Sequence, residues 1–255
     1  MDLTYAAQRF SLDGKKAVVT GASGGIGRGI AEAMAHLGAE VAVLGRNPQK
    51  LRDTEEAIQA FGGKCDTWAF DVADPEASDA FFRDYEAKHG APDIFVCNAG
   101  STVRKHLTQT ENDEMEHLLG TDFKGAIYGL RWAGNVMKAK GGNIIVITSV
   151  NALYPLPSQA VYTGIKCALE GIVRCMAAEL APYGIRVNTC APGAVNTDLV
   201  APHSETVCLR PGIPLGHAAQ PEEIGEAVAL MATDAFRYMT GSTVLIDGGL
   251  MLRTP

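Results

Sequence analysis

A glycine-rich turn, Gly21-Ala22-Ser23-Gly24-Gly25-Ile26-Gly27, connects the apolar run 17–20 to an amphipathic run over residues 30–37. Its glycines carry no Cβ atom, so a pyrophosphate group could approach their backbone closely. A helix that begins near Gly25 would add unpaired N–H groups and the positive end of its dipole. The spacing Gly-x-x-x-Gly-x-Gly departs from the common Gly-x-Gly-x-x-Gly fingerprint. The turn predicts a phosphate site between a strand and a helix, with an ordinary glycine-rich turn as the alternative.

Composition and charge narrow the class of protein. The 255 residues are 47% hydrophobic and 20% charged, so residues 1–255 are expected to form a single domain. With 22 basic and 29 acidic residues, the net charge of −7 offers no basic face for nucleic acid. No apolar run approaches the roughly 18 residues of a membrane span, and the first ten residues do not resemble a secretory leader. We expect a cytoplasmic protein whose partners include neither nucleic acid nor membrane.

Cysteines and histidines give no sign of a metal site. The six histidines are scattered without helix-face metal spacing, and no Cys-x-x-Cys pair occurs. The cysteines stand mostly in apolar stretches, which predicts small reduced core residues. They are Cys65, Cys97, Cys167, Cys175, Cys190 and Cys208.

Short apolar runs alternate with helical stretches, as in parallel βαβ units. Strands are expected at 16–20, 40–44, 64–70, 94–98, 143–149, 186–190 and 243–246, with helices at 25–37, after Pro48, after Pro75, at 112–137, at 158–180 and after Pro221. Continuously apolar strands imply a sheet covered on both faces, and right-handed crossovers make it doubly wound. The sequence therefore predicts an α/β fold with a seven-stranded parallel sheet between two layers of helices.

Small or polar residues stand at the expected strand ends. Ligands of such sheets bind beyond the carboxyl ends of the strands, so these residues are expected to converge on one crevice. They are Gly21, Gly45-Arg46, Asp71, Asn98, Ser149 and Pro192-Gly193.

Tyr162 and Lys166 are four residues apart on an expected helix, which places them on one face. A free tyrosine phenol has a pKa of about 10, and a nearby cation favours the phenolate. Such a phenol could act as an acid or base near neutral pH. The spacing also arises by chance, but Ser149 ends a strand in the same crevice, where its hydroxyl could hold a carbonyl oxygen.

Together these motifs resemble the short-chain dehydrogenase/reductase family over about residues 12–249, with a substrate-loop region at about 194–219. The resemblance implies a single-domain Rossmann fold and an NAD(P)-dependent alcohol dehydrogenase or carbonyl reductase. The matching motifs are Thr20–Gly27, Asn98-Ala99-Gly100, Ser149 thirteen residues before Tyr162, Lys166, Ala191-Pro192-Gly193 with Thr197, and Asp247-Gly248-Gly249.

The resemblance also implies individual roles. Tyr162 would exchange a proton with the substrate oxygen, Ser149 would hydrogen-bond that oxygen, and Lys166 would bind the nicotinamide ribose and favour the phenolate. Asp71 and Val72 would lie at the adenine. Expected cofactor contacts are Gly21, Ser23, Gly24, Gly25, Ile26, Gly27, Arg46, Asn47, Asp71, Val72, Asn98, Ala99, Gly100, Tyr162, Lys166, Pro192, Gly193, Val195 and Thr197.

Asp122 departs from the family pattern, which usually has an asparagine in the helix before the serine strand. A carboxylate cannot donate an amide hydrogen, so the family's proton-relay water would be held differently. Alternatively, Asp122 pairs directly with Lys166 and opposes its effect on Tyr162. Either arrangement predicts a reduced rate or a shifted pH optimum, and we include Asp122 among the candidate catalytic residues.

Cofactor preference is expected at the end of the second strand, where no carboxylate is present to accept the ribose 2′-hydroxyl of NAD. Arg46 offers a guanidinium that suits a 2′-phosphate, so NADP(H) is favoured over NAD(H). The alternative is that Arg46 is a solvated loop residue or stacks on the adenine.

The substrate wall is expected from residues 101–106, 150–157 and 195–213. Arg104 could pair with a substrate carboxylate or be part of a solvated basic loop, and residues 10–15 resemble the start of sugar and sugar-acid reductases. Leu153, Tyr154, Leu156, Val200 and Leu209 favour an apolar ketone equally. Expected substrate contacts are Ser149, Asn151, Tyr162 and Arg104.

The sequence leaves three functions open. The first is an NADP(H)-dependent reductase of a ketone, polyol, sugar or sugar acid, the second a 3-oxoacyl thioester reductase, and the third a nucleotide-sensing binding protein with weak catalysis. The resemblance further implies a homotetramer, with the helix 158–180 and the last strand at interfaces.

Overall fold

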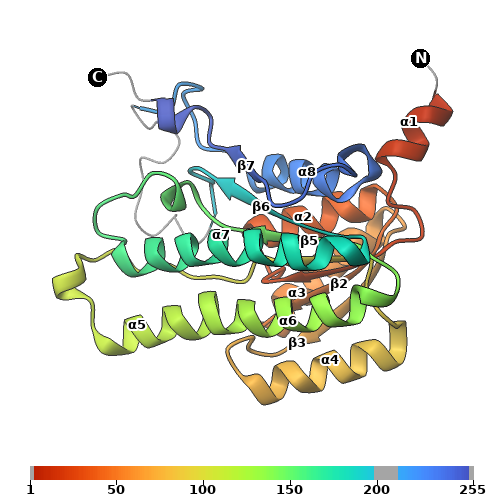
Figure 1. Ribbon diagram of the computed structural model, residues 1–255, viewed down its shortest axis with the longest axis horizontal. Helices are drawn as coiled ribbons and strands as arrows, with labels where there is room; N and C mark the ends of the chain where they lie inside the picture. Colours follow the sequence, from red (N-terminus) through yellow and green to blue (C-terminus); the bar gives the residue numbers. More distant parts are fainter. Residues whose placement is uncertain (1–2, 198–211, 253–255) are drawn as a thin grey trace.

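A seven-stranded, all-parallel sheet forms the centre of the computed structural model, which describes residues 3–197 and 212–252. The strand order is β3-β2-β1-β4-β5-β6-β7, so the order reverses between β1 and β4. The strands are β1 Lys16–Thr20, β2 Glu40–Gly45, β3 Lys64–Ala69, β4 Ile94–Cys97, β5 Gly142–Ile147, β6 Ile185–Pro192 and β7 Thr243–Ile246. The predicted doubly wound α/β fold is confirmed (Figure 1).

Helices cover both faces of the sheet. They are α1 Leu3–Phe10, α2 Gly25–His36, α3 Pro48–Ala60, α4 Pro75–His89, α5 Asn112–Leu118, α6 Gly125–Val136, α7 Ala160–Leu180 and α8 Pro221–Ala232. Proline suits the first turn of a helix because its missing N–H is not needed there, and Pro48, Pro75 and Pro221 each begin one. Asn47 and Asp74 cap α3 and α4 by accepting hydrogen bonds from the first free N–H groups.

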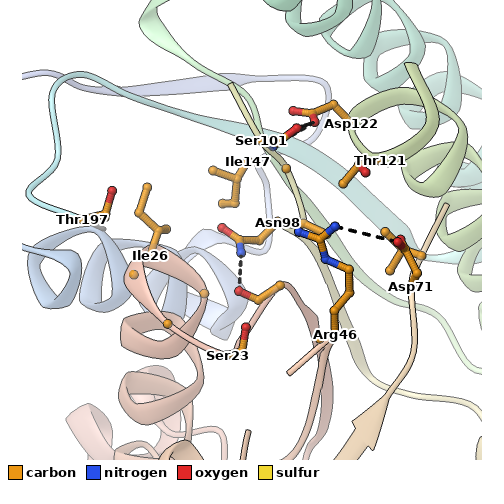
Figure 2. Close-up of a pocket in the computed structure, with 18 of the residues that line it drawn as sticks. Ser23, Ile26, Arg46, Asp71, Asn98, Ser101, Thr121, Asp122, Ile147 and Thr197 are labelled. Carbon is orange, nitrogen blue, oxygen red and sulfur yellow. Dashed lines mark hydrogen bonds and ion pairs between the residues drawn. The ribbon is translucent and has the colours of Figure 1, made fainter. Parts of the chain in front are cut away.

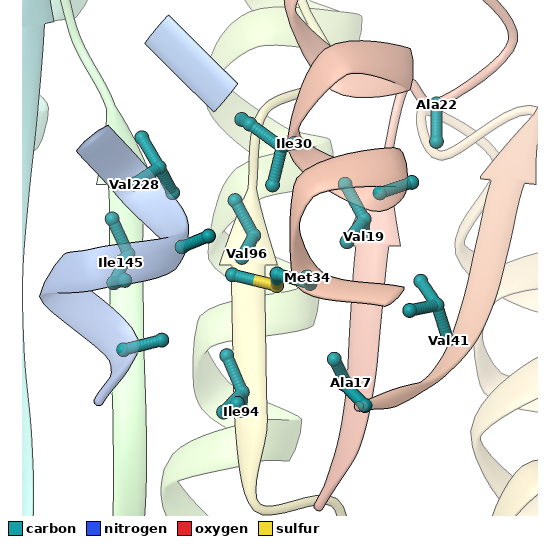
Figure 3. Packing of buried hydrophobic residues seen from close by; sticks show 14 of the residues in the cluster. Ala17, Val19, Ala22, Ile30, Met34, Val41, Ile94, Val96, Ile145 and Val228 are labelled. Carbon is teal, nitrogen blue, oxygen red and sulfur yellow. The ribbon is translucent and has the colours of Figure 1, made fainter. Parts of the chain in front are cut away.

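Alternate residues of the central strands β1, β4 and β5 enter two separate cores. Val19, Val96 and Ile145 point to the face covered by α2, α3 and α8, where Met34 is fully buried (Figure 3). Val18, Phe95 and Ile144 point to the other face, among residues of α4, α6 and α7. Full burial of such an apolar side chain contributes about 1.5–3 kcal/mol, and both faces are needed to fix the sheet. This packing explains why the central strands are almost continuously apolar.

The helix expected over residues 112–137 is not continuous. A π-helical turn, Leu119–Lys124, separates α5 from α6, and the N–H of Gly125 bonds the carbonyl of Gly120. The two helices still run as one rod (Figure 1). Such single π-helical turns occur inside longer α-helices, and the expected range 112–137 described only the ends of the helical run. The turn carries Asp122, which therefore has a different orientation from that in a regular helix.

The lead before β1 contains the helix α1, which was not predicted from the sequence.

The expectation about the cysteines is corrected in part. Cys167 and Cys175 are exposed on α7, so the prediction that cysteines are core residues is wrong for these two, because the outward face of that helix carries small side chains. Cys97 and Cys190 are buried, Cys65 is half-buried, and Cys208 lies outside the described residues.

Candidate active site

The glycine-rich turn has the shape that a phosphate cradle needs. Gly21 and Gly25 adopt positive φ angles of 67° and 52°, which favour glycine. A Cβ on Gly27 would collide with the Gly21 carbonyl oxygen, whereas one on Gly24 would meet nothing within 4 Å. Asn98 at the end of β4 holds the turn, because its side-chain amide donates to the carbonyls of Thr20 (2.9 Å) and Gly21 (3.2 Å). The turn thus leaves an open, rigid backbone surface at the start of α2.

A cavity of about 400 Å³ lies at the carboxyl ends of β1, β2, β4 and β5 (Figure 2). It is at the strand-order reversal, the place where open α/β sheets bind ligands. Predicted residues that line it are Gly21, Ser23, Gly24, Gly25, Ile26, Gly27, Arg46, Asp71, Val72, Asn98, Ala99, Gly100, Asp122, Tyr162, Lys166 and Thr197. Gly45, expected in the crevice, and Ser101, at the start of the expected substrate wall, also line it. The lining residues that the sequence did not indicate are Lys50, Phe70, Thr121, Ile147 and Thr148. Most of these stand next to a selected residue in the sequence, and this neighbourhood was the signal that could have found them.

Other predicted residues do not line this cavity. Asn47 caps α3 with its side-chain oxygen, and Pro192 ends β6 with Gly193 directly after it. Val195 is buried in the core beneath α2 and α8 and pairs with Ala219 in a β-bridge. Arg104 is exposed on the loop after β4.

Tyr162 and Lys166 face each other on α7. The Lys166 Nζ atom lies 5.4 Å from the centre of the Tyr162 ring and donates a hydrogen bond to the Ile147 carbonyl (3.2 Å). Lys166 is only 4% exposed. The predicted helical spacing therefore brings a phenol and a buried cation together at the end of β5.

Ser149 is buried and directly follows Ile147 and Thr148, which line the cavity, but Ser149 is not itself one of the lining residues. Its Oγ atom accepts a hydrogen bond from the Asn151 N–H (3.2 Å), which leaves its own hydrogen available to donate. Asn151 Nδ2 donates to Gln159 Oε1 (2.8 Å), and Gln159 Nε2 donates to Thr102 Oγ1 (3.1 Å). These bonds join the Ser149 loop, the start of α7 and the loop after β4 into one polar wall.

Asp122 projects from the π-helical turn towards Lys166. Its Oδ1 atom lies 3.7 Å from Lys166 Nζ, and its Oδ2 atom accepts from the Ser101 N–H (2.8 Å) and Oγ (2.9 Å). Among the described residues, Oδ1 has no hydrogen-bond partner. The structure thus contains the direct Asp122–Lys166 pair that the sequence offered as one alternative.

Burial and charge act in opposite directions on this pair. Burial raises the pKa of Asp122 above its usual range, although Lys166 and Ser101 oppose the rise. Burial alone would lower the pKa of Lys166, but the neighbouring Tyr162 and Asp122 more than offset it, so that pKa lies above its ordinary value. Lys166 is therefore a cation throughout the neutral range. Burial also raises the pKa of the nearby Cys97 thiol to about 12, so Cys97 is not a ready nucleophile.

The other end of the cavity carries opposite charges. Arg46 Nη1 lies 3.8 Å from Asp71 Oδ2, with both side chains substantially exposed (Figure 2). Lys50, on the first turns of α3, lines the same region. An exposed pair at this distance contributes little stability, so Arg46 can exchange Asp71 for a more strongly charged anion at small cost.

Part of the expected substrate wall can be placed. Leu153 and Tyr154 are exposed, with 41% and 44% of their surface accessible, and Leu156 is half-buried. Val200 and Leu209 lie outside the described residues, as does the rest of the segment 198–211.

In residues 3–197 and 212–252, no group of three or more His, Cys, Asp or Glu side chains could hold a metal ion, and no helix is long and apolar enough to cross a membrane.

Comparison with known proteins identifies the family. A family model described as enoyl-(acyl carrier protein) reductase matches residues 21–251. The chain belongs to the short-chain dehydrogenase/reductase family. It is accordingly an NAD(P)-dependent oxidoreductase of carbonyl and alcohol groups, and its fold binds a nicotinamide cofactor.

Among its relatives, the chain is 35% identical to the 3-oxoacyl-(acyl-carrier-protein) reductase FabG of Pseudomonas aeruginosa, over 95% of this chain and 99% of that protein. It is 32% identical to gluconate 5-dehydrogenase of Gluconobacter oxydans, over 94% and 96%. The structure of L-sorbose reductase from Gluconobacter frateurii, complexed with NADPH and L-sorbose, matches with a TM-score of 0.89 and 27% identity, over 96% of this chain and 100% of that one.

Proposed function

We propose that this protein is an NADP(H)-dependent reductase that transfers a hydride between the nicotinamide and a carbonyl or secondary alcohol carbon of a polyol, sugar or sugar acid. One observation carries the proposal. Tyr162 and the buried Lys166 lie together on α7 at one end of the cavity, and Lys166 bonds the carbonyl of Ile147 at the end of β5. The glycine-rich turn at the other end fits a pyrophosphate, because Gly24 is open and the backbone is rigid.

When bound, the nicotinamide supplies or accepts the hydride, and the protein supplies position and protons. Tyr162 gives its phenolic proton to the substrate oxygen during reduction and takes it back during oxidation. Ser149 donates its free hydrogen to the same oxygen. Lys166 holds the cofactor ribose, and its ammonium group lies 5.4 Å from the centre of the Tyr162 ring, close to the proton that is exchanged.

The cationic end of the cavity supports NADP(H) over NAD(H). Gly45, the last residue of β2, carries no carboxylate that could accept a ribose 2′-hydroxyl, whereas Arg46 and Lys50 line this region. A 2′-phosphate would take Arg46 from its long, exposed contact with Asp71, because charge-assisted bonds to phosphate are stronger. The similar L-sorbose reductase structure contains NADPH, which agrees with this preference.

A hydroxylated substrate is supported by the polar wall beside Ser149. Asn151, Gln159 and Thr102 form a continuous hydrogen-bonded chain there, and Arg104 stands on the adjacent loop. Two of the similar proteins are named for gluconate and sorbose chemistry. The exposed Leu153 and Tyr154, together with 35% identity to a 3-oxoacyl reductase, favour the second candidate, a 3-oxoacyl thioester substrate.

The same proposal includes a homotetramer. The sheet ends in the edge strand β7, whose Leu245 is 40% exposed, and edge strands tend to pair with other chains. On α7, a Cβ on Gly164 or Gly171 would meet nothing within 4 Å, so a second helix could approach closely. Light scattering at micromolar concentration tests this, and a monomeric mass would contradict it.

The function is tested by following reduced-nicotinamide absorbance with NADPH and NADH separately, against ketoses, keto sugar acids, diketones and a 3-oxoacyl thioester. We expect NADPH to be consumed with a hydroxylated ketone, and Tyr162→Phe to lose turnover while it still binds NADPH by fluorescence. Turnover of the thioester alone would favour the second candidate. Tight NADPH binding without turnover on any substrate would instead support the nucleotide-sensing protein.

A further inference from the structure

Glu170 is a buried carboxylate for which the proposed reaction has no use. It lies on α7 four residues after Lys166 and eight after Tyr162, and it is 3% exposed. Residues at these spacings lie on one side of a helix, where Lys166 and Glu170 are buried and Tyr162 lines the cavity. Glutamate is seldom buried this fully without a specific partner.

The partners of Glu170 are mainly threonine hydroxyls from two strands. Its Oε1 atom accepts from Thr148 Oγ1, and its Oε2 atom accepts from Thr243 Oγ1, each at 2.7 Å. Thr243 Oγ1 in turn accepts from Thr189 Oγ1 (2.9 Å). Arg174 is the one nearby cation in the described ion pairs of Glu170, at 3.7 Å, but its side chain is 60% exposed. The carboxylate therefore joins α7 to the carboxyl end of β5, to β7 and, through Thr243, to β6.

These contacts lie next to the proposed reaction centre. Thr148 lines the cavity and is followed directly by Ser149. One turn earlier on α7, Lys166 donates to the carbonyl of Ile147, the residue before Thr148. Two successive turns of α7 are thus bonded to Ile147, the last residue of β5, and to Thr148, which directly precedes Ser149.

Stability alone gives little reason for this carboxylate. An apolar side chain of similar volume commonly packs at such a position with equal or greater stability, because a buried charge must be desolvated. What a carboxylate adds is direction, since two short charge-assisted bonds fix the position of α7 along the strands. Active-site groups need this accuracy, because a displacement of about 1 Å can cost roughly a hundredfold in rate.

We propose that Glu170 is a positioning residue that, through Thr148 and Thr243, sets Tyr162 and Lys166 in register with Ser149. This inference rests on the proposed function, because it assigns Glu170 a purpose only if these three side chains act together. Glu170 touches neither substrate nor cofactor in this scheme and acts through α7 and β5.

The test compares variants that keep or remove the hydrogen bonds at equal volume. Glu170→Gln can keep them: its amide donates to Thr148 Oγ1, whose hydrogen turns to the Cys190 carbonyl at 3.2 Å, and its oxygen accepts from Thr243. Glu170→Met loses both bonds. The matched control is Glu179→Met, an exposed glutamate on the same helix.

We expect Glu170→Met to lower kcat at least about tenfold with the NADPH dissociation constant unchanged within about twofold, and Glu170→Gln and Glu179→Met to stay within about threefold of the wild-type kcat. Thr148→Val should lower kcat similarly, and adding it to Glu170→Met should cause little further loss, since the two residues act as a unit. A Glu170→Met protein with a lower Tm but wild-type kcat would show a purely structural role and overturn the proposal. Equal losses in the Gln and Met variants would also overturn it, because the bonds would not be the cause.

A second measurement keeps this test separate from the proposed function. Hydrogen exchange of the backbone amides of residues 148–152 needs no substrate, and we expect it to accelerate in Glu170→Met while the amides of β2 and α3 keep their wild-type rates. If the wild-type protein turns over no substrate, the proposed function fails, and this exchange result alone decides whether Glu170 positions the Ser149 loop. Unchanged exchange at residues 148–152 would refute the inference.

Discussion

Replacing Asp122 by asparagine removes a negative charge beside Lys166 without changing the shape of the side chain. The Asp122 Oδ1 atom lies 3.7 Å from Lys166 Nζ, and at an effective dielectric constant of about 20 their attraction is about 4 kcal/mol. Because Asp122 raises the pKa of Lys166, its removal must lower that pKa, and burial then acts unopposed by this carboxylate.

The sign of the effect follows from the charge state of Lys166. The wild-type ammonium keeps its proton past its ordinary pKa, so kcat for alcohol oxidation should not decline on the alkaline side below about pH 10. In Asp122→Asn, we expect the decline to begin at a lower pH than in the wild type, because the carboxylate that raises the pKa of Lys166 is gone. At pH values below that decline the variant should be at least as active as the wild type, since the cation beside Tyr162 is no longer partly neutralised.

The assay is the pH dependence of kcat, measured with saturating NADP and the alcohol form of the best substrate. Asp113→Asn is the matched control, because Asp113 is exposed on α5. Hydrogen bonds from Ser101 to Asp122 can be lost in the variant, so NADP binding is measured in parallel to separate altered binding from altered titration. If the alkaline side of the profile is the same in wild type and Asp122→Asn, the Asp122 charge does not act on Lys166 and the reasoning is refuted.

Three further substitutions test the cofactor site and the core. Arg46→Ala should raise the KM for NADPH about 10–100-fold while the KM for NADH changes little, because a charged hydrogen bond is worth about 1.5–3 kcal/mol; equal changes for both cofactors would contradict an Arg46 contact with the 2′-phosphate. Gly27→Ala should abolish NADPH binding in a fluorescence titration, since its Cβ would collide with the Gly21 carbonyl, and wild-type affinity would contradict the rigid cradle. Met34→Ala should reduce the free energy of unfolding in urea by about 2–5 kcal/mol, because Met34 is fully buried between α2 and the sheet; a loss below about 1 kcal/mol would mean that this core is loosely packed.

The fold was predictable because its signals are local and repeated. Apolar strands alternate with helices that begin at Pro48, Pro75 and Pro221, and this alternation defines the βαβ order. The βαβ order in turn defines the edge of the sheet where Gly21 and Asn98 meet. The same rule explains why many predicted cofactor residues line one cavity.

What the sequence could not give depends on contacts between distant segments or on small changes in helix geometry. The single π-helical turn lies inside a longer helical run, and the sequence predicted only that run, so it left both outcomes for Asp122 open. Lys50 stands one turn into α3, and its place in the cavity follows from how α3 packs on β2. Glu170 has the polarity of a surface residue, and only the meeting of α7 with Thr148 and Thr243 shows that it is buried.

The charges around Lys166 also favour an enzyme over a nucleotide-binding sensor. A nucleotide-binding sensor needs the glycine-rich turn and Arg46, but it has no use for a buried Lys166 beside Tyr162. The pairing of Lys166 with Asp122 moderates that site rather than removing it, since Lys166 keeps its proton. The account thus predicts an active enzyme with an unusual pH profile.

Transfer of deuterium from NADPH labelled at C4 of the nicotinamide is the most direct test of the central claim. The labelled cofactor, prepared separately on each face of the ring, is incubated with the substrate selected by the absorbance assay, and the product is analysed by mass spectrometry. We predict one deuterium on the new carbinol carbon from one face of the ring only, and none from Tyr162→Phe. A product that forms without deuterium from either face would contradict hydride transfer at this site.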